Sequence, residues 1–387
     1  MQLKRALANT FVVVASVCIS FGAAEVAARL FLRSADYLSV QMVRDPVLGA
    51  VPATVSRTGF DEWGFRNRSV PKSAEIVAIG DSHTYGNTAR MEDSWPYVLQ
   101  ELSGRSVYNM GMGGYGPNQY RHLLEKALRL NPKLVLCGLY MGDDFENAYL
   151  ITYGLEYWSR LRRESARHVS FDIWGTTANE LPWHKNVRNW LSGHSVIYQL
   201  LFHGPLVGLF QGEIQIRNAT RSNPAATVLS VPAKNILEAF IPGSLLKNLD
   251  QDSDSVREGM RVTFALLDEM NALCARQGAR FAVVIIPTKE LVFSDYLEHD
   301  PALPNSAKLI KLLANERLAR ARVVEHLNST SIPVVDTLSA LKRASANGLY
   351  ARSAADMHPG RSGYRVIAET VASSLDLKET KQSLRVH

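Results

Sequence analysis

Short apolar segments alternate with amphipathic helical patterns along most of this 387-residue chain. Five segments have the length of strands and lie at 76–79, 105–109, 133–140, 281–286 and 333–336. Between them, apolar residues recur every three or four positions, which is the period of a helix with one buried face. Helices are expected at 119–130, 255–277 and 306–327, and after Pro359. The alternation predicts an α/β fold in three layers with a mostly parallel five-stranded sheet.

The first strand segment leads directly into a nucleophilic side chain. Residues 76–79 (IVAI) run into Gly80, and Asp81 and Ser82 follow at once. A strand that ends in a tight turn would aim the Ser82 hydroxyl at the carboxyl edge of the sheet, where open α/β folds bind ligands. A serine hydroxyl needs a positioned base to act as a nucleophile at neutral pH. Ser82 is therefore a candidate nucleophile that requires a base elsewhere in the chain.

Two histidines are candidates for that base. His83 adjoins Ser82, but neighbouring side chains at the start of a helix diverge by about 100°, so His83 is badly placed to take the proton. We expect His83 to pack or to line the substrate instead. His358 lies in a loop between the last strand and the last helix, which also faces the carboxyl edge. His358 is therefore the candidate general base.

Three further motifs follow Ser82: NMGMGG at 109–114, GDDF at 142–145 and DMHP at 356–359. In order and spacing, they and the GDS motif at 80–82 resemble the four blocks of the SGNH (GDSL-type) serine hydrolases. The likeness covers residues 59–150 and 255–375. It implies a doubly wound, flavodoxin-like sheet, an acyl-Ser82 intermediate, His358 as the base, and chemistry without a metal or cofactor.

The acidic member of the catalytic set departs from the family pattern. The family places an aspartate three residues before the histidine, where this chain has Ala355, and Asp356 stands two residues before. A loop could still fold Asp356 onto the imidazole of His358 to orient it. A backbone carbonyl could instead orient His358, which would leave a Ser-His dyad.

The oxyanion-hole donors also depart from the pattern. The resemblance assigns the backbone amides of Ser82 and Gly114 as two donors, and it places Asp143 where the family has a donating asparagine. An ionised carboxylate only accepts hydrogen bonds. Either burial keeps Asp143 protonated, or Asn147 donates instead, or the site is degraded. The adjoining Asp143 and Asp144 could hold a metal, but no histidine stands nearby, so we expect no metal site.

The N-terminal residues 1–34 carry a targeting signal. Lys4 and Arg5 precede an uncharged, largely apolar stretch at 6–24. Its length is close to the roughly 20 residues that span a bilayer, which favours an N-terminal membrane helix over a cleaved signal peptide. Under either alternative, the hydrolase-like domain at 35–377 lies outside the cytoplasm and is periplasmic or extracellular. Residues 378–387 form a tail.

Residues from about 151 to 254 interrupt the strand-helix alternation and predict an inserted, cap-like segment. Four of the six tryptophans lie there, at 158, 174, 183 and 190, and could stack on sugar rings or bury cap helices. Arginines 160, 162, 163 and 167 could face an anionic polymer, and the apolar stretch 195–210 could rest on a membrane. Beyond the insertion, Lys289 follows a strand and is a candidate substrate contact.

The charge distribution and the positions of the cysteines argue against a nucleic-acid partner and against a disulfide framework. The net charge of +6 is dispersed along the chain without a basic block, so we expect no nucleic-acid partner. The three cysteines are far apart in the sequence and do not suggest a disulfide framework.

The resemblance and the N-terminal signal together point to a membrane-anchored enzyme. We expect it to remove or transfer a small O-acyl group, such as acetyl, on a surface or secreted polysaccharide, with partners in an envelope polysaccharide pathway. Two alternatives stay open: a lipid esterase at the membrane, and a catalytically silent glycan-binding or scaffold subunit of an envelope assembly complex.

Overall fold

The central sheet has five strands, and all of its pairings are parallel. The computed structural model describes residues 2–53, 59–163, 183–202, 226–234, 236–299, 303–304, 306–350 and 356–377. Across the sheet the strands are β4 (Val107–Gly111), β3 (Ile76–Gly80), β5 (Leu134–Tyr140), β8 (Arg280–Ile286) and β9 (Val334–Asp336). The first strand of this sheet along the chain, β3, therefore lies between the second and third, β4 and β5. Numbered along the chain, the strand order is 2-1-3-4-5, which is flavodoxin-like. The predicted α/β class and parallel sheet are confirmed.

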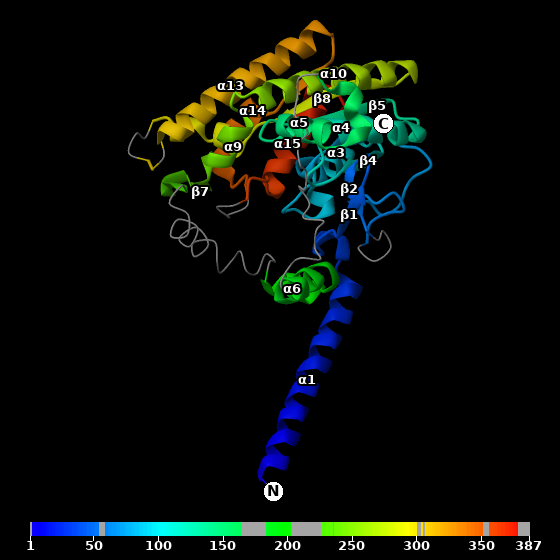
Figure 1. Ribbon diagram of the computed structural model, residues 1–387, viewed down its shortest axis with the longest axis vertical. Helices are drawn as coiled ribbons and strands as arrows, with labels where there is room; N and C mark the ends of the chain where they lie inside the picture. The colour runs from blue at the N-terminus through cyan, green and yellow to red at the C-terminus, as the bar shows by residue number, and fades with distance from the viewer. Residues whose placement is uncertain are drawn as a thin grey trace, which may run out of the picture.

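Helices cover both faces of this sheet, as Figure 1 shows. Side chains alternate along each strand, so Val77 and Ile79 enter one core and Ile76 and Ala78 the other. The first core is closed by α4 (Pro117–Ala127), α5 (Asp144–Gly154), α10 (Asp254–Arg276) and α13 (Ser306–Ser329). The second is closed by α3 (Trp95–Ser103), α14 (Leu338–Ala344) and α15 (Arg361–Ser374). The result is the expected three-layer arrangement.

Some helices and strands begin or end at other residues than the sequence predicts. The strand expected at 105–109 starts and ends two residues later, at Val107–Gly111, in register with Gly80 of β3. The helix expected at 119–130 begins earlier, because Pro117 suits the first helical turn. It ends at Ala127, and a 3₁₀ turn at Leu128–Leu130 stops at Asn131, which is left-handed with φ 52°.

Helix α10 packs so closely on α5 that its Gly259 has no room for a side chain. A Cβ at Gly259 would overlap the backbone of Phe145. We expect Gly259→Ala to lower the free energy of unfolding by about 1–3 kcal/mol, since overpacking outweighs the helix preference of alanine. In α9 (Pro242–Asn248), nothing lies within 4 Å of a Cβ built at Gly243. Gly243→Ala is thus the matched control, and equal denaturation midpoints for both variants would contradict the prediction.

The N-terminal helix α1 (Gln2–Phe31) projects away from the rest of the protein in Figure 1. Its segment Leu7–Phe31 is 25 residues long, has a mean hydropathy of 2.1 and is not buried by the protein. The carboxyl end of α1 packs on α7 (Val196–Phe202), and its Arg29 donates a 2.6 Å hydrogen bond to the carbonyl of His194 at the end of α6 (Trp183–His194). There Glu25 accepts hydrogen bonds from the backbone of Val196 and Ile197, each 3.0 Å long.

The predicted insertion also contributes a small antiparallel hairpin, β6 (Thr227–Val231) and β7 (Ile236–Phe240), which packs on the second core. The remaining short elements are β1 (Met42–Asp45), β2 (Gly49–Pro52), α2 (Ser82–Tyr85), α11 (Lys289–Val292) and α12 (Ser294–Leu297). Several sequence features fall outside the described residues: Arg167, Trp174, the 203–210 half of the apolar stretch, Ala355 and the tail at 378–387.

Candidate active site

Three glycines in register on adjacent strands let helix α2 start directly on the sheet. Gly80, Gly111 and Gly138 face one another in register on β3, β4 and β5. A Cβ at Gly80 or Gly138 would overlap the Thr84 side chain, and one at Gly111 would overlap the backbone of α2. The packing role of Thr84 and Gly138 was not predicted, although a glycine within or at the end of a strand can indicate a close approach of another backbone.

Asp81 caps the short helix that carries Ser82. One of its carboxylate oxygens accepts a 2.9 Å hydrogen bond from the backbone N–H of His83, which fixes the start of α2. The other oxygen lies 3.4 Å from the Ser82 Oγ and 3.0 Å from the His83 Nδ1. Burial raises the pKa of Asp81, but the charge and hydrogen bonds of His83 outweigh it and hold that pKa below its ordinary value.

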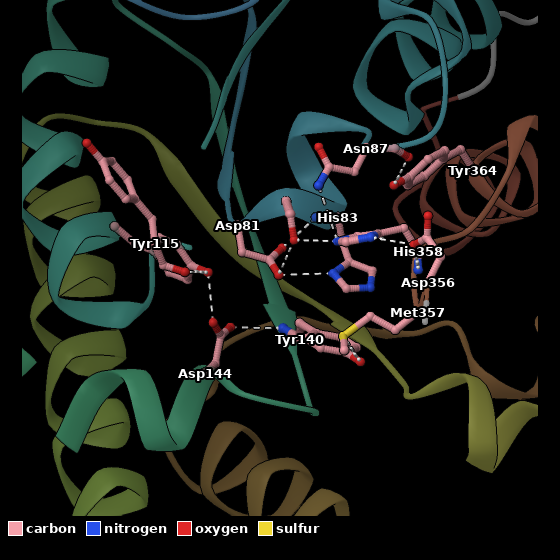
Figure 2. Close-up of polar contacts among 12 residues, drawn as sticks. Asp81, His83, Asn87, Tyr115, Tyr140, Asp144, Asp356, Met357, His358 and Tyr364 are labelled. Atoms are coloured by element: carbon pink, nitrogen blue, oxygen red, sulfur yellow. Dashed lines mark hydrogen bonds and ion pairs between the residues drawn. The ribbon is translucent and has the colours of Figure 1, made fainter. Parts of the chain in front are cut away.

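The structure brings Ser82, His358 and Asp356 into a single chain of hydrogen bonds, although 276 positions separate the serine from the histidine. His358 Nε2 lies 2.8 Å from Ser82 Oγ, and His358 Nδ1 lies 2.8 Å from Asp356 Oδ1. The same Asp356 oxygen accepts a 2.9 Å bond from the backbone N–H of His358. Figure 2 shows the imidazole of His358 beside Asp356. The two-residue spacing is therefore long enough for the carboxylate to reach the ring.

Contacts on both flanks of His358 hold the loop that carries it. On one side, Thr88 Oγ1 donates to the Pro359 carbonyl over 2.8 Å, and Gly360 N donates to the Leu349 carbonyl over 2.7 Å. On the other, the Tyr140 hydroxyl lies 3.3 Å from the sulfur of Met357. Both flanks of His358 are fixed, so its imidazole is presented to Ser82 in one orientation.

His83 lies behind the histidine that contacts Ser82. Its ring is 1% exposed, stacks on Tyr140 with centroids 3.8 Å apart, and sits 4.8 Å from the ring of His358. Figure 2 shows His83 and His358 one beside the other, with only His358 reaching Asp356. We expected His83 either to pack or to line the substrate. The packing role fits its burial, because a ring enclosed by Tyr140 and His358 has little surface left for contact with a substrate.

The glycine-rich loop after β4 lies against the serine. A Cβ built at Gly113 would stand 3.9 Å from the Cβ of Ser82. Gly114 has φ 76°, a left-handed conformation that side chains disfavour. The loop backbone therefore comes close to Ser82 at Gly113.

Asp143 belongs to a group of three carboxylates, in which Asp81 and Asp144 are buried and Asp143 is half-buried. Ligand oxygens of Asp81, Asp143 and Asp144 all lie within 4.8 Å of one another. Burial raises the pKa of Asp143 to about 7, with the charge of Asp81 adding to that shift and His358 opposing it. Burial and the two neighbouring carboxylates also raise the pKa of Asp144 well above its ordinary value. The cluster therefore retains protons near neutral pH.

The protein already supplies partners to most of this cluster. Asp144 accepts a 2.8 Å bond from the Tyr120 hydroxyl and a 2.9 Å bond from the Tyr140 N–H. By contrast, the Oδ1 atom of Asp143 is buried and makes no hydrogen bond to any residue that the structure describes. Three carboxylates are a ligand set that a cation could use, but two of them are engaged by hydroxyl and N–H donors, so the arrangement suits shared protons better.

Two further sequence-predicted residues are buried. Asn147 is 7% exposed and packs against Gly116. A Cβ built on Gly116 would lie only 2.8 Å from the Cβ of Asn147. Lys289 is 2% exposed, and its ammonium contacts Glu238 and the carbonyl of Asp356. This burial favours a structural role for Lys289 over the expected contact with substrate, since its charge is enclosed by protein partners.

The insertion supplies no cluster of unpaired arginines among its described residues. Arg160, Arg162 and Arg163 pair with Glu269, Glu156 and Glu258. Trp158 is 2% exposed, and its indole N–H donates to the Val47 carbonyl, whereas Trp190 is 58% exposed. Trp158 thus serves the packing alternative rather than a stacking platform.

Comparison with known proteins gives one sequence match. Residues 247–386 match the family model described as the SGNH hydrolase-like domain of the acetyltransferase AlgX. The match includes Asp356 and His358, while Ser82 lies outside it. No curated protein matches the chain in sequence.

Several solved structures align with the chain at low similarity. A lipolytic protein of the G-D-S-L family from Desulfitobacterium hafniense has 13% identity, with 78% of this chain and 99% of that one covered and a TM-score of 0.38. Phospholipase A1 from Streptomyces albidoflavus has 10% identity, with coverage of 78% and 99% and a TM-score of 0.40. A catalytic mutant of Axe2, an acetylxylan esterase from Geobacillus stearothermophilus, has 11% identity, with coverage of 79% and 95% and a TM-score of 0.35.

The family match and the four sequence blocks agree on the kind of enzyme. The match covers the segment with the DMHP block, and the fold joins that segment to the GDS block at one edge of the sheet. Such a domain is an ester hydrolase or acyltransferase. Residues 247–386 thus match the SGNH hydrolase-like domain family, and the four blocks of the chain resemble those of the SGNH (GDSL-type) hydrolases.

Proposed function

We propose that the protein transfers acyl groups through Ser82, with His358 as general base and Asp356 as the residue that orients it. The observation that carries this proposal is the position of His358, 2.8 Å from the Ser82 hydroxyl at one nitrogen and 2.8 Å from Asp356 at the other. This geometry supports a proton path from the serine to the imidazole, and it supports Asp356 as the stabiliser of the imidazolium.

In the first half-reaction, the Ser82 oxygen attacks the ester carbonyl while His358 takes the hydroxyl proton. The tetrahedral intermediate collapses, the bond to the leaving alcohol breaks, and His358 returns the proton to that alcohol. In the second half, water or a sugar hydroxyl attacks the acyl-Ser82 and His358 again moves the proton. Water gives hydrolysis, whereas a sugar hydroxyl gives acyl transfer.

The developing oxyanion needs donors at this site. We assign the backbone amides of Ser82 and Gly114 to that role, supported by the close approach of the glycine loop. A protonated Asp143 is a third donor, supported by its buried, unpartnered oxygen and its raised pKa. Among the alternatives considered for the third donor, the protonated carboxylic acid fits these observations best.

For the substrate, we propose a small O-acyl group on a polysaccharide outside the cytoplasm. The matched family model is that of an acetyltransferase, which favours acetyl as the group carried. The exposed apolar helix α1 supports a membrane anchor at the N-terminus and an extracytoplasmic catalytic domain.

A chromogenic ester tests the catalytic proposal directly. We expect the full chain in detergent to release nitrophenol from p-nitrophenyl acetate and to be labelled at Ser82 by a fluorophosphonate, as read by mass spectrometry of the peptide. Ser82→Ala should abolish both signals. A wild-type chain that forms no adduct would instead support the catalytically silent scaffold.

The length of the acyl chain distinguishes the two enzymatic alternatives. We expect kcat/KM to be higher for p-nitrophenyl acetate than for the octanoate, because the proposed substrate carries a small acyl group. The two esters have the same leaving group, so their comparison isolates the acyl pocket. A strong preference for octanoate would instead favour a lipid esterase.

A further inference from the structure

The acidic residue of the proposed catalytic set has little support from its own loop. Asp356 accepts two hydrogen bonds from His358, through the ring and the backbone, but both partners belong to the same short turn. Among the described residues, the hydrogen bond that reaches Asp356 from outside this turn comes from Lys289, whose Nζ lies 3.1 Å from the Asp356 carbonyl oxygen.

Lys289 stands at the carboxyl edge for a local reason. Strand β8 ends at Ile286, and Thr288 then caps helix α11, its side chain accepting a bond from Leu291 N–H. Lys289 is thus the first residue of that helix and points along the edge toward the loop of His358. With 2% of its surface exposed, its charge needs protein partners.

The inserted hairpin provides these partners. Glu238 Oε2 lies 3.4 Å from Lys289 Nζ, and the ring centroid of Phe240 lies 5.2 Å from it. Residues two apart on a strand share a face, so one face of β7 encloses the ammonium with a carboxylate and an aromatic ring. Phe240 is itself part of the second core, which fixes this strand against the sheet.

We propose that Lys289, held by Glu238 and Phe240 of the inserted hairpin, is a positioning residue that fixes Asp356 for its bond to His358. The inference rests on the proposed function. It gives the hairpin a role in catalysis that involves no contact with the substrate. Its physical basis is that one buried ammonium joins three segments: the turn after β8, strand β7 and the loop of His358.

The charges around Lys289 agree with this role. Burial alone raises the pKa of Asp356, but the hydrogen bonds and charge of His358, with a contribution from Lys289, bring it below its ordinary value. The neighbouring Glu290 is buried as well, and Lys289 opposes the rise that burial causes in its pKa. Removal of the ammonium would therefore both loosen the loop and make the carboxylate of Asp356 easier to protonate.

The test compares kcat and KM for p-nitrophenyl acetate in the full-length protein. We expect Lys289→Met to lower kcat at least about tenfold with little change in KM, because small displacements of a catalytic group slow the chemical step more than binding. Lys234→Met is the matched control. Lys234 lies in the same hairpin, is exposed and contacts Tyr296 rather than the loop, so its kcat should equal that of wild type.

Two double variants separate positioning from folding. Lys289→Met leaves the Glu238 carboxylate buried without its ion pair, whereas Lys289→Met/Glu238→Gln removes both charges. We expect the double variant to regain thermal stability but not kcat. In an Asp356→Ala background, Lys289→Met should lower kcat no further, since Lys289 acts through Asp356.

Three results would overturn the inference: wild-type kcat in Lys289→Met, recovery of kcat together with stability in the double variant, or additive losses with Asp356→Ala. If the wild-type chain neither turns over the ester nor labels at Ser82, the proposed function itself fails. An active wild type with unaffected Lys289→Met would reject only the positioning role.

Discussion

Ser82→Ala and His358→Ala are each expected to lower kcat at least about 10³-fold, and the double variant only slightly more. The two side chains act as one unit, because the serine attacks only when the histidine takes its proton. Removing either side chain therefore removes most of the rate enhancement. The measurement is turnover of p-nitrophenyl acetate by the three variants, with circular dichroism to verify folding.

An ion-paired histidine elsewhere in the protein provides the control. His326 Nε2 lies 3.0 Å from Asp268 Oδ1, a contact similar to that of His358 with Asp356 but on helix α13. His326→Ala should leave kcat unchanged. Full activity in Ser82→Ala, or losses that multiply in the double variant, would remove the assignment of these residues as one catalytic unit.

We expect the activity of the wild-type enzyme to decline above about pH 7, and we expect Asp143→Asn to abolish this decline. The pKa of Asp143 is raised to about 7, so its carboxyl is protonated and able to donate below this pH. It ionises above this pH, and the charge then repels the oxyanion. One donor in such a hole is worth about 10²- to 10³-fold in kcat. The wild type should therefore lose up to about 10²-fold on the alkaline side, while an asparagine donates at every pH.

The pH profile of kcat for the wild type, Asp143→Asn and Asp143→Ala tests this expectation. Asp143→Ala should be slow at all pH values without a decline specific to alkaline pH, since it lacks both the donor and the charge. A folded Asp143→Asn protein without activity would show that the ionised carboxylate is required, and the alignment of Asp143 with the oxyanion position would then be wrong. Unchanged kcat in Asp143→Ala would mean that the two backbone amides suffice.

Local sequence patterns were enough to predict the sheet, because the strands β3, β5 and β8 are buried on both faces and so carry almost only apolar residues. Boundaries were less certain where pairing with a neighbouring strand sets the ends of an element, as in β4, which lies two residues later than expected. The family resemblance, which rested on four short motifs, is confirmed by the match at 247–386.

The sequence by itself determined which side chains are available at the carboxyl edge. Ser82, Asp143, Lys289 and His358 all follow strands or precede helices of one parallel sheet, and that geometry brings the ends of all its strands to one side. Sequence spacing could not say which of them touch, because contact across the edge depends on strand order and loop path, both set by packing between distant segments.

Tertiary structure alone decided the roles that depend on burial. It placed His358 against Ser82 across 276 positions and enclosed His83 behind it. It also placed Lys289, which the sequence suggests as a candidate substrate contact, as a buried ion-pair partner of Glu238. Burial in the folded protein also raises the pKa of Asp143 to about 7. The physical reason is common to all of these: the loss of water around a polar group, and the identity of the partner that replaces it, are properties of the folded neighbourhood and not of the local sequence.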